Sequence, residues 1–246
     1  MKTRTPPLLC VHGFLGAPAD WDALAQALPV ETWALPGHGS PPASSFEDAV
    51  QQLIARIRAC PVPPHLVGYS MGGRLALAAA LEPGVRLASL VIISASPGLE
   101  TESARVARAR ADDRLADDLA ARGLPRFVRD WYAQPLFASL RRRPALLHDV
   151  LTRRADGDAA ARAAALRALT VGRQPSLWPR LSGLTPPALF IAGERDVKYR
   201  DGLARAAGLC PRARLLTVPD SGHLPHLERP AFVQYHLQNW VGETSI

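Results

Sequence analysis

Short, continuous runs of apolar residues recur along the chain, separated by longer segments of mixed polarity. The runs cover residues 8–12, 30–35, 65–69, 87–94, 188–192 and 214–218. Such runs are typical of strands that are buried on both faces of a parallel sheet. The pattern therefore predicts an α/β protein with a mostly parallel sheet and helices on both faces.

The segments between these runs have helical composition. Asp20 and Ser45 stand where N-caps are expected, before helices at residues 21–28 and 46–58. Further helices are expected at residues 71–82, 199–209 and 230–240.

The alternation of strand and helix stops after the strand that ends near Ser94. Residues 97–186 contain no convincing strand, but helical segments at 103–121, 124–132, 144–154 and 158–170. We therefore expect a core made of residues 1–96 and 187–246, with residues 97–186 inserted as a helical cap over the carboxyl edge of the sheet. The alternative is a second folding domain without function, whose apolar faces are buried only against one another.

One stretch organises the rest of the chain. The apolar run from His65 ends in Gly68-Tyr69-Ser70-Met71-Gly72, and a segment rich in Ala and Leu follows at once. A serine between two small residues, at a sharp turn from strand to helix, has its hydroxyl exposed above the sheet. The alternative, a glycine-rich turn with an incidental serine, does not account for the flanking strand and helix.

A serine nucleophile or base needs an imidazole, and the imidazole needs a carboxylate to fix its tautomer. Asp196 and His223 each follow a predicted strand, and the chain order Ser70, Asp196, His223 is that of α/β-hydrolases. Glu194 is an alternative to Asp196 as the orienting acid. The other candidates have simpler roles: Asp220 in a local turn, His12 and His38 fixing loops, and His226 and His236 exposed or packed.

An oxyanion hole is expected from two backbone N–H groups. In this fold one donor follows the nucleophile, here Met71, and the other lies in the loop after the first strand, here assigned to Phe14 in His12-Gly13-Phe14. Alternatively, His12-Gly13 simply forms a tight exit from that strand.

Bulk properties narrow the class of ligand. The 246 residues are 48% hydrophobic and 21% charged, with a net charge of +7 and far more arginine than lysine. The arginines form no aromatic-interleaved stripe or nucleic-acid motif, so an anionic small molecule is the favoured partner over nucleic acid or membrane. The alternative is an ordinary solvated basic surface.

The cysteine content and the lengths of the apolar segments indicate the cellular compartment of the protein. Three distant cysteines predict no disulfide framework, and no His/Asp spacing suits a metal, so neither metal nor cofactor is expected. The first seven residues lack a signal-peptide stretch and no window reaches the length of a membrane span, so a cytoplasmic protein is expected.

Arginines near the serine point to a carboxylate-bearing substrate. Arg74 lies four residues after Ser70 and shares its helix face. Arg105, Arg108 and Arg110 open the cap, although each can instead be a solvent charge paired with a nearby aspartate. A neutral ester would gain nothing from a desolvated guanidinium.

The chain resembles the 2-succinyl-6-hydroxy-2,4-cyclohexadiene-1-carboxylate synthase family of menaquinone biosynthesis over most of its length. Three matching segments are generic to α/β-hydrolases: residues 12–16, 35–39 and 221–223. Ser70-x-Gly72-Gly73-Arg74 and the cap segments are more particular, and the matching segments also include residues 97–99 with the arginine run, 131–139 and 193–196.

The resemblance implies a lyase that eliminates pyruvate from a substrate with three carboxylates, with Ser70, Asp196 and His223 as the triad. It further implies that Arg74 and Arg108 bind carboxylates and that Tyr69 and Trp131 line the pocket. A third arginine falls at Arg153 or Arg154, and we assign Arg153. Whether Ser70 or His223 takes the proton stays open at this point.

Two other classes of function compete with the lyase. A carboxylesterase or thioesterase would act on the same scaffold through an acyl-Ser70, and a non-enzymatic binding protein would not need the complete triad. We expect a monomer or weak homodimer, with reduced leading antiparallel strands.

Overall fold

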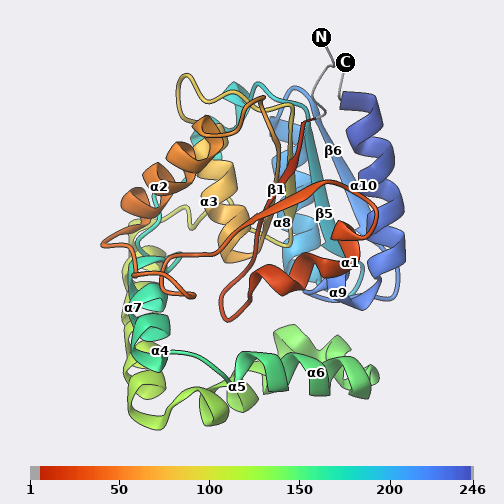
Figure 1. Ribbon diagram of the computed structural model, residues 1–246. Helices are drawn as coiled ribbons and strands as arrows, with labels where there is room; N and C mark the ends of the chain where they lie inside the picture. The colour runs from red at the N-terminus through yellow and green to blue at the C-terminus, as the bar shows by residue number, and fades with distance from the viewer. Residues whose placement is uncertain (1–5, 245–246) are drawn as a thin grey trace.

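A computed structural model describes residues 6–244, and its six strands form one all-parallel sheet in the order β2-β1-β3-β4-β5-β6 (Figure 1). The strands are β1 Leu8–Val11, β2 Val30–Trp33, β3 His65–Tyr69, β4 Ser89–Ile93, β5 Ala188–Gly193 and β6 Ala213–Val218. The four inner strands are buried throughout, whereas the edge strands β2 and β6 are partly exposed. The predicted parallel α/β sheet is confirmed. The expectation about a signal peptide falls mostly on residues 1–5, outside the described residues.

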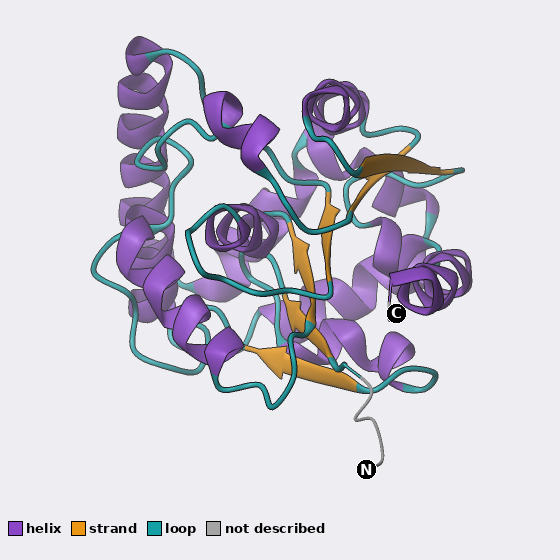
Figure 2. Cartoon of the chain, turned by 90° about the horizontal axis from the view of Figure 1, so that it is seen from above, coloured by secondary structure: helices purple, strands orange, loops and turns teal. Residues whose placement is uncertain are grey.

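Helices cover both faces of the sheet (Figure 2). One face carries α2 Phe46–Arg58, α3 Met71–Ala80 and α8 Val197–Leu209, and the other carries α1 Asp22–Ala25 and α10 Pro230–Thr244. Two further helices are only one turn long, η1 Pro18–Trp21 and α9 Pro225–Glu228. Among residues 6–244 we find no helix with the length and apolar character needed to cross a membrane.

The two predicted N-caps have different outcomes. The hydroxyl of Ser45 accepts a hydrogen bond from the Asp48 N–H at 3.1 Å, so it caps α2 as expected. Asp20 caps no helix: α1 begins only at Asp22, and the Asp20 carboxylate forms a buried ion pair with Arg154 of the cap at 2.9 Å. The prediction for Asp20 was wrong because its carboxylate accepts from Arg154 and from the preceding Ala17 N–H at 3.4 Å, and not from an N–H of the helix that follows.

All-helical structure separates β4 from β5. It consists of α4 Glu102–Arg122, α5 Leu124–Ala133, η2 Pro135–Arg142, α6 Pro144–Arg154, α7 Ala159–Ala168 and η3 Trp178–Gly183. In Figure 1, α5 and α6 lie across one end of the sheet. Buried side chains of this insertion, such as Phe127 and Leu140, belong to the same apolar cluster as the sheet. The insertion therefore does not bury its apolar faces only against itself, while its boundaries at 97 and 186 stay a prediction.

Candidate functional site

The serine lies at the turn between β3 and α3, in a strained backbone conformation. Ser70 has φ 50° and ψ −111°, which is in the positive-φ region that side chains rarely adopt, and its N–H donates to the Ile93 carbonyl at 2.9 Å. Gly72 allows the turn to close, because a Cβ there would lie 2.3 Å from the His12 carbonyl oxygen. The local sequence thus holds the Ser70 hydroxyl at the carboxyl edge of the sheet.

The structure brings Ser70, His223 and Asp196 together in a hydrogen-bonded chain. Ser70 Oγ lies 3.2 Å from His223 Nε2, and His223 Nδ1 lies 2.7 Å from Asp196 Oδ2. His223 and Asp196 are buried and Ser70 is half-buried. Glu194, the alternative acid, is exposed and accepts from the Asp220 N–H at 3.0 Å. Asp196 is therefore the carboxylate that orients the imidazole.

A cavity of about 610 Å³ opens beside this triad, between the sheet edge and the cap. Its wall includes the predicted Phe14, Tyr69, Met71, Arg74, Arg108 and Trp131. Met71 is the first residue of α3, where backbone N–H groups have no partner within the helix. A more open groove of about 1000 Å³ lies around Leu87 and Arg212 and contains no triad residue.

Arg74 is a buried cation in the wall of this cavity. It is 8% exposed, and burial lowers the pKa of its guanidinium to about 10. Its guanidinium donates to Gln174 Oε1 at 2.9 Å and to the Leu169 carbonyl, both in the cap. Within residues 6–244 no carboxylate lies within ion-pair distance of it. Arg74 therefore stays protonated at neutral pH with donors to spare.

The arginines of α4 differ in position. Arg108 lines the cavity, and its Nε donates to both carboxylate oxygens of Asp112 at 2.9 Å. Arg105 is instead bonded to Glu102 and to the Leu99 carbonyl, and Arg110 is exposed. Of these three, Arg108 is the one that the structure places at the cavity.

The assignment of Arg153 to the substrate does not agree with its position. Arg153 is exposed and paired with Asp149 on the same helix, and it does not line the cavity. The neighbouring Arg154 points inward, but its guanidinium is held by Asp20 and by the Tyr132 hydroxyl. The helical register turns one arginine to solvent and the other to the core, so neither reaches the triad.

Aromatic side chains form the apolar part of the wall. Trp131 stacks on Phe127 and meets the edge of Phe14, with ring centroids 5.7 Å and 5.2 Å away. The Tyr69 ring lies 5.5 Å from that of His223, and burial raises the pKa of Tyr69 well above its usual range. Phe14, Tyr69 and Trp131 thus form an apolar wall beside the triad.

Two histidines fix the loops near Phe14, as expected. His12 Nε2 accepts from the Leu35 N–H at 3.2 Å, and His38 Nε2 accepts from the Leu15 N–H at 3.1 Å. Burial lowers the pKa of His12 to about 4 and that of His38 well below its usual value. Both rings are therefore neutral at pH 7 and serve as acceptors.

Helix α8 contributes cavity residues that the sequence reasoning missed. Lys198 and Tyr199 line the cavity together with Arg195, and the Tyr199 ring lies 4.6 Å from that of His223. Their signal was their position directly beside Asp196, at the carboxyl edge of the sheet. No group of three or more metal-ligating side chains occurs in the described part of the chain.

Comparisons with known proteins agree with this geometry. The alpha/beta hydrolase family model matches residues 8–233. The 2-succinyl-6-hydroxy-2,4-cyclohexadiene-1-carboxylate synthase of Salmonella newport is 34% identical over 93% of this chain and 91% of its own length. The chain belongs to this synthase family of α/β-hydrolases. The resemblance drawn from the motifs is thereby confirmed.

Two solved structures and one plant protein extend the comparison. The solved structure of MenH from S. aureus is 30% identical, with a TM-score of 0.93, covering 100% of this chain and 97% of that one. The chloroplastic protein PHYLLO of Arabidopsis thaliana is 32% identical over 95% of this chain, which spans only 15% of PHYLLO. A thermophilic esterase from Thermogutta terrifontis, 23% identical with a TM-score of 0.84 over 98% of this chain and 91% of that one, shares the fold.

Proposed function

We propose that this protein is a lyase of menaquinone biosynthesis that eliminates pyruvate from 2-succinyl-5-enolpyruvyl-6-hydroxy-3-cyclohexene-1-carboxylate. The observation that carries the proposal is Arg74, a buried cation without a carboxylate partner in the described chain, in the same cavity as a complete triad. Burial of an unpaired charge is unfavourable unless a ligand supplies the opposite charge. A substrate with three carboxylates does so, and the family relatives carry the name of this synthase.

The cations of the cavity bind and orient this substrate. Arg74 offers its unused N–H groups to one carboxylate, and planar guanidinium forks suit carboxylates better than ammonium groups do. Arg108 stands on the cap side of the cavity, and its Nε is already held by the buried Asp112. We assign the terminal nitrogens of Arg108, which lines the cavity, as a second carboxylate site.

The triad supplies the base. Ser70 Oγ takes the proton from the ring carbon while its own proton passes to His223 Nε2 across the 3.2 Å hydrogen bond. Asp196 holds Nδ1 and stabilises the imidazolium that forms. The electron pair of the broken C2–H bond forms the C2=C3 double bond, the C3=C4 double bond moves to C4=C5, and the C5–O bond to the enolpyruvyl group breaks. The enolpyruvate that leaves takes the proton of the His223 imidazolium at its methylene carbon and becomes pyruvate.

Removal of the proton builds negative charge on the oxygen of the adjacent carbonyl group. Two backbone N–H groups stabilise that charge. We assign them to Phe14 and Met71, both in the cavity wall beside Ser70. Each such donor is worth about 3 kcal/mol in comparable oxyanion holes. No acyl-enzyme is required.

A carboxylesterase acting through an acyl-serine is the second candidate. It is favoured by the Ser70–His223 hydrogen bond, which also activates a nucleophile. It supplies no anion for the buried Arg74, which then only donates its two hydrogen bonds to the cap.

Pyruvate release from the enolpyruvyl substrate, measured beside cleavage of p-nitrophenyl acetate and butyrate, separates the two candidates. We expect rapid pyruvate release with negligible ester cleavage, and loss of at least about a thousandfold in kcat for Ser70→Ala. Efficient ester cleavage without pyruvate release would establish the esterase instead. Residual lyase activity of Ser70→Ala within tenfold of the native rate would exclude the serine as the base.

A further inference from the structure

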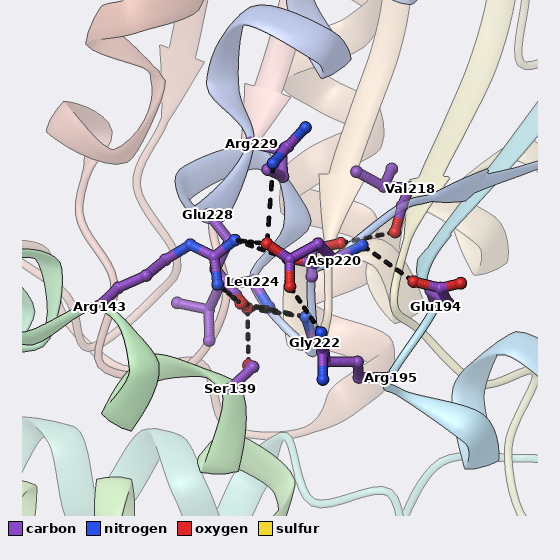
Figure 3. Close-up of polar contacts among 11 residues, drawn as sticks. Ser139, Arg143, Glu194, Arg195, Val218, Asp220, Gly222, Leu224, Glu228 and Arg229 are labelled. Carbon is purple, nitrogen blue, oxygen red and sulfur yellow. Dashed lines mark hydrogen bonds and ion pairs between the residues drawn. The ribbon is translucent and has the colours of Figure 1, made fainter.

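The carboxylate of Glu228, at the end of α9, lies against the loop that carries His223 (Figure 3). Glu228 Oε1 accepts from the Gly222 N–H at 3.0 Å and from the Leu224 N–H at 3.2 Å. The backbone N–H groups immediately before and after His223 therefore bond to one carboxylate. This arrangement leaves the 221–222 and 223–224 peptide planes, which bracket the catalytic histidine, little freedom to rotate.

The same carboxylate also reaches the cap. The Ser139 hydroxyl, in η2, donates to Glu228 Oε1 at 3.0 Å, and the Arg143 guanidinium lies 3.6 Å from Oε2. The cap approaches very closely here, because a Cβ on Gly222 would lie 2.1 Å from Ser139 Oγ. Glu228 is thus the point where the cap and the His223 loop meet.

A second group of contacts surrounds the first, around Asp220 (Figure 3). Arg143 donates to the Asp220 carbonyl at 2.6 Å and to its carboxylate at 2.9 Å. Arg195, which precedes the catalytic Asp196, donates to the other carboxylate oxygen of Asp220 at 2.7 Å. One cap arginine therefore contacts the His223 loop, and that loop is tied in turn to the loop of the catalytic aspartate.

Burial makes Glu228 an unusual choice for a merely structural position. Its side chain is fully shielded from solvent, and a buried carboxylate persists only where several donors converge on it. The apolar alternative would leave the Gly222 and Leu224 N–H groups without partners. The buried Glu228 carboxylate therefore holds the backbone of both neighbours of His223.

We propose that Glu228 is a positioning residue for His223, and that it transmits the seating of the cap at Ser139 and Arg143 to the triad. It touches neither substrate nor reacting atoms. It acts by keeping His223 Nε2 at 3.2 Å from Ser70 Oγ and Nδ1 at 2.7 Å from Asp196. The part of this inference that is tested by turnover rests on the proposed function, because it needs the lyase reaction as its assay.

The test compares Glu228→Gln, which keeps the shape but removes the charge, with Glu243→Gln, an exposed glutamate of α10 paired with Arg214. A displacement of about 1 Å in a catalytic group costs about 100-fold in rate, so we expect Glu228→Gln to lose about 100-fold in kcat with KM within about threefold. Glu243→Gln should keep native values of both.

A second readout does not depend on the identity of the substrate. The ring ¹⁵N chemical shifts of His223, assigned by their loss in His223→Gln, report its hydrogen bonds to Asp196 and Ser70. We expect these shifts to move in Glu228→Gln and to stay unchanged in Glu243→Gln. If the native protein released no pyruvate, the proposed function would fail while this measurement still tested Glu228.

Glu228→Asp provides a second variant should Glu228→Gln not fold, because it keeps the charge and retracts it by one methylene. A folded variant of either kind with native kcat and native His223 shifts would overturn the proposal. So would a fall in thermal stability with both catalytic readouts unchanged, because that outcome marks a purely structural residue.

Discussion

Replacing Arg74 by methionine tests whether its guanidinium binds the substrate in addition to holding the cap, since methionine fills a similar volume without charge. In the folded protein Arg74 is a buried cation, and burial lowers its pKa from the usual value for arginine to about 10. A shift of this size corresponds to about 3 kcal/mol of unfavourable free energy for the charged form at neutral pH. The variant removes that cost.

The same substitution removes two hydrogen bonds to the cap. Gln174 Oε1 and the Leu169 carbonyl lose their donor, and each buried acceptor left without a partner costs about 1–3 kcal/mol. These losses offset the gain from removing the charge. We therefore expect the free energy of unfolding of Arg74→Met, measured in urea, to lie within about 3 kcal/mol of the native value.

Activity should respond much more strongly than stability. Two charge-assisted hydrogen bonds to a substrate carboxylate are worth about 1.5–3 kcal/mol each, or about 10²- to 10⁴-fold in kcat/KM together. Pyruvate release coupled to NADH oxidation by lactate dehydrogenase measures this loss directly. A folded Arg74→Met protein with kcat/KM within fivefold of native would refute the assignment of Arg74 to a substrate carboxylate.

Three further predictions test other parts of the structure. Gly72→Ala should lower the free energy of unfolding by about 3 kcal/mol or more, because its Cβ would lie 2.3 Å from a backbone oxygen, whereas Gly202→Ala, in open space on α8, should not destabilise the protein. Burial lowers the pKa of His226 to about 3, so from pH 6.5 downward the unfolded chain binds a proton that the folded ring does not, and stability falls. At pH 5 this ring accounts for about 2 kcal/mol of the loss, and urea unfolding of His226→Phe at pH 7 and 5 should show a correspondingly smaller drop. Lys198→Met, at the exposed rim of the cavity, should raise KM about threefold with kcat nearly unchanged, and an unaltered KM in steady-state assays would exclude this lysine from substrate binding.

The triad could be predicted from the sequence because its geometry follows from topology. The turn at Ser70 needs small residues at fixed neighbouring positions, and parallel strands deliver Asp196 and His223 to the same rim. The local motif and the strand order therefore determine nearly all of the triad's geometry. The oxyanion donors and the roles of the cavity residues stay predictions, to be tested by activity.

The cap could not be predicted at the same level. Helical patterns located its helices, but the choice between Arg153 and Arg154 depends on which side of α6 faces the core, and that side is set by Asp20, 134 residues away. The same long-range ion pair explains why Asp20 does not cap the following helix as the local sequence predicts. Glu228 gave no signal for a related reason, since its donors come from two separate segments of the chain.

The buried pair of Asp20 and Arg154 also bears on how enzymes with this architecture can diversify. It joins a residue of the core to a residue of the cap, with both side chains about 4% exposed. Exchanging the cap for that of another hydrolase would leave the Asp20 carboxylate in the interior without its cation, at a cost of about 3–5 kcal/mol. We therefore expect a chimaera with a foreign cap to be less stable unless Asp20 and Arg154 are transferred or replaced together.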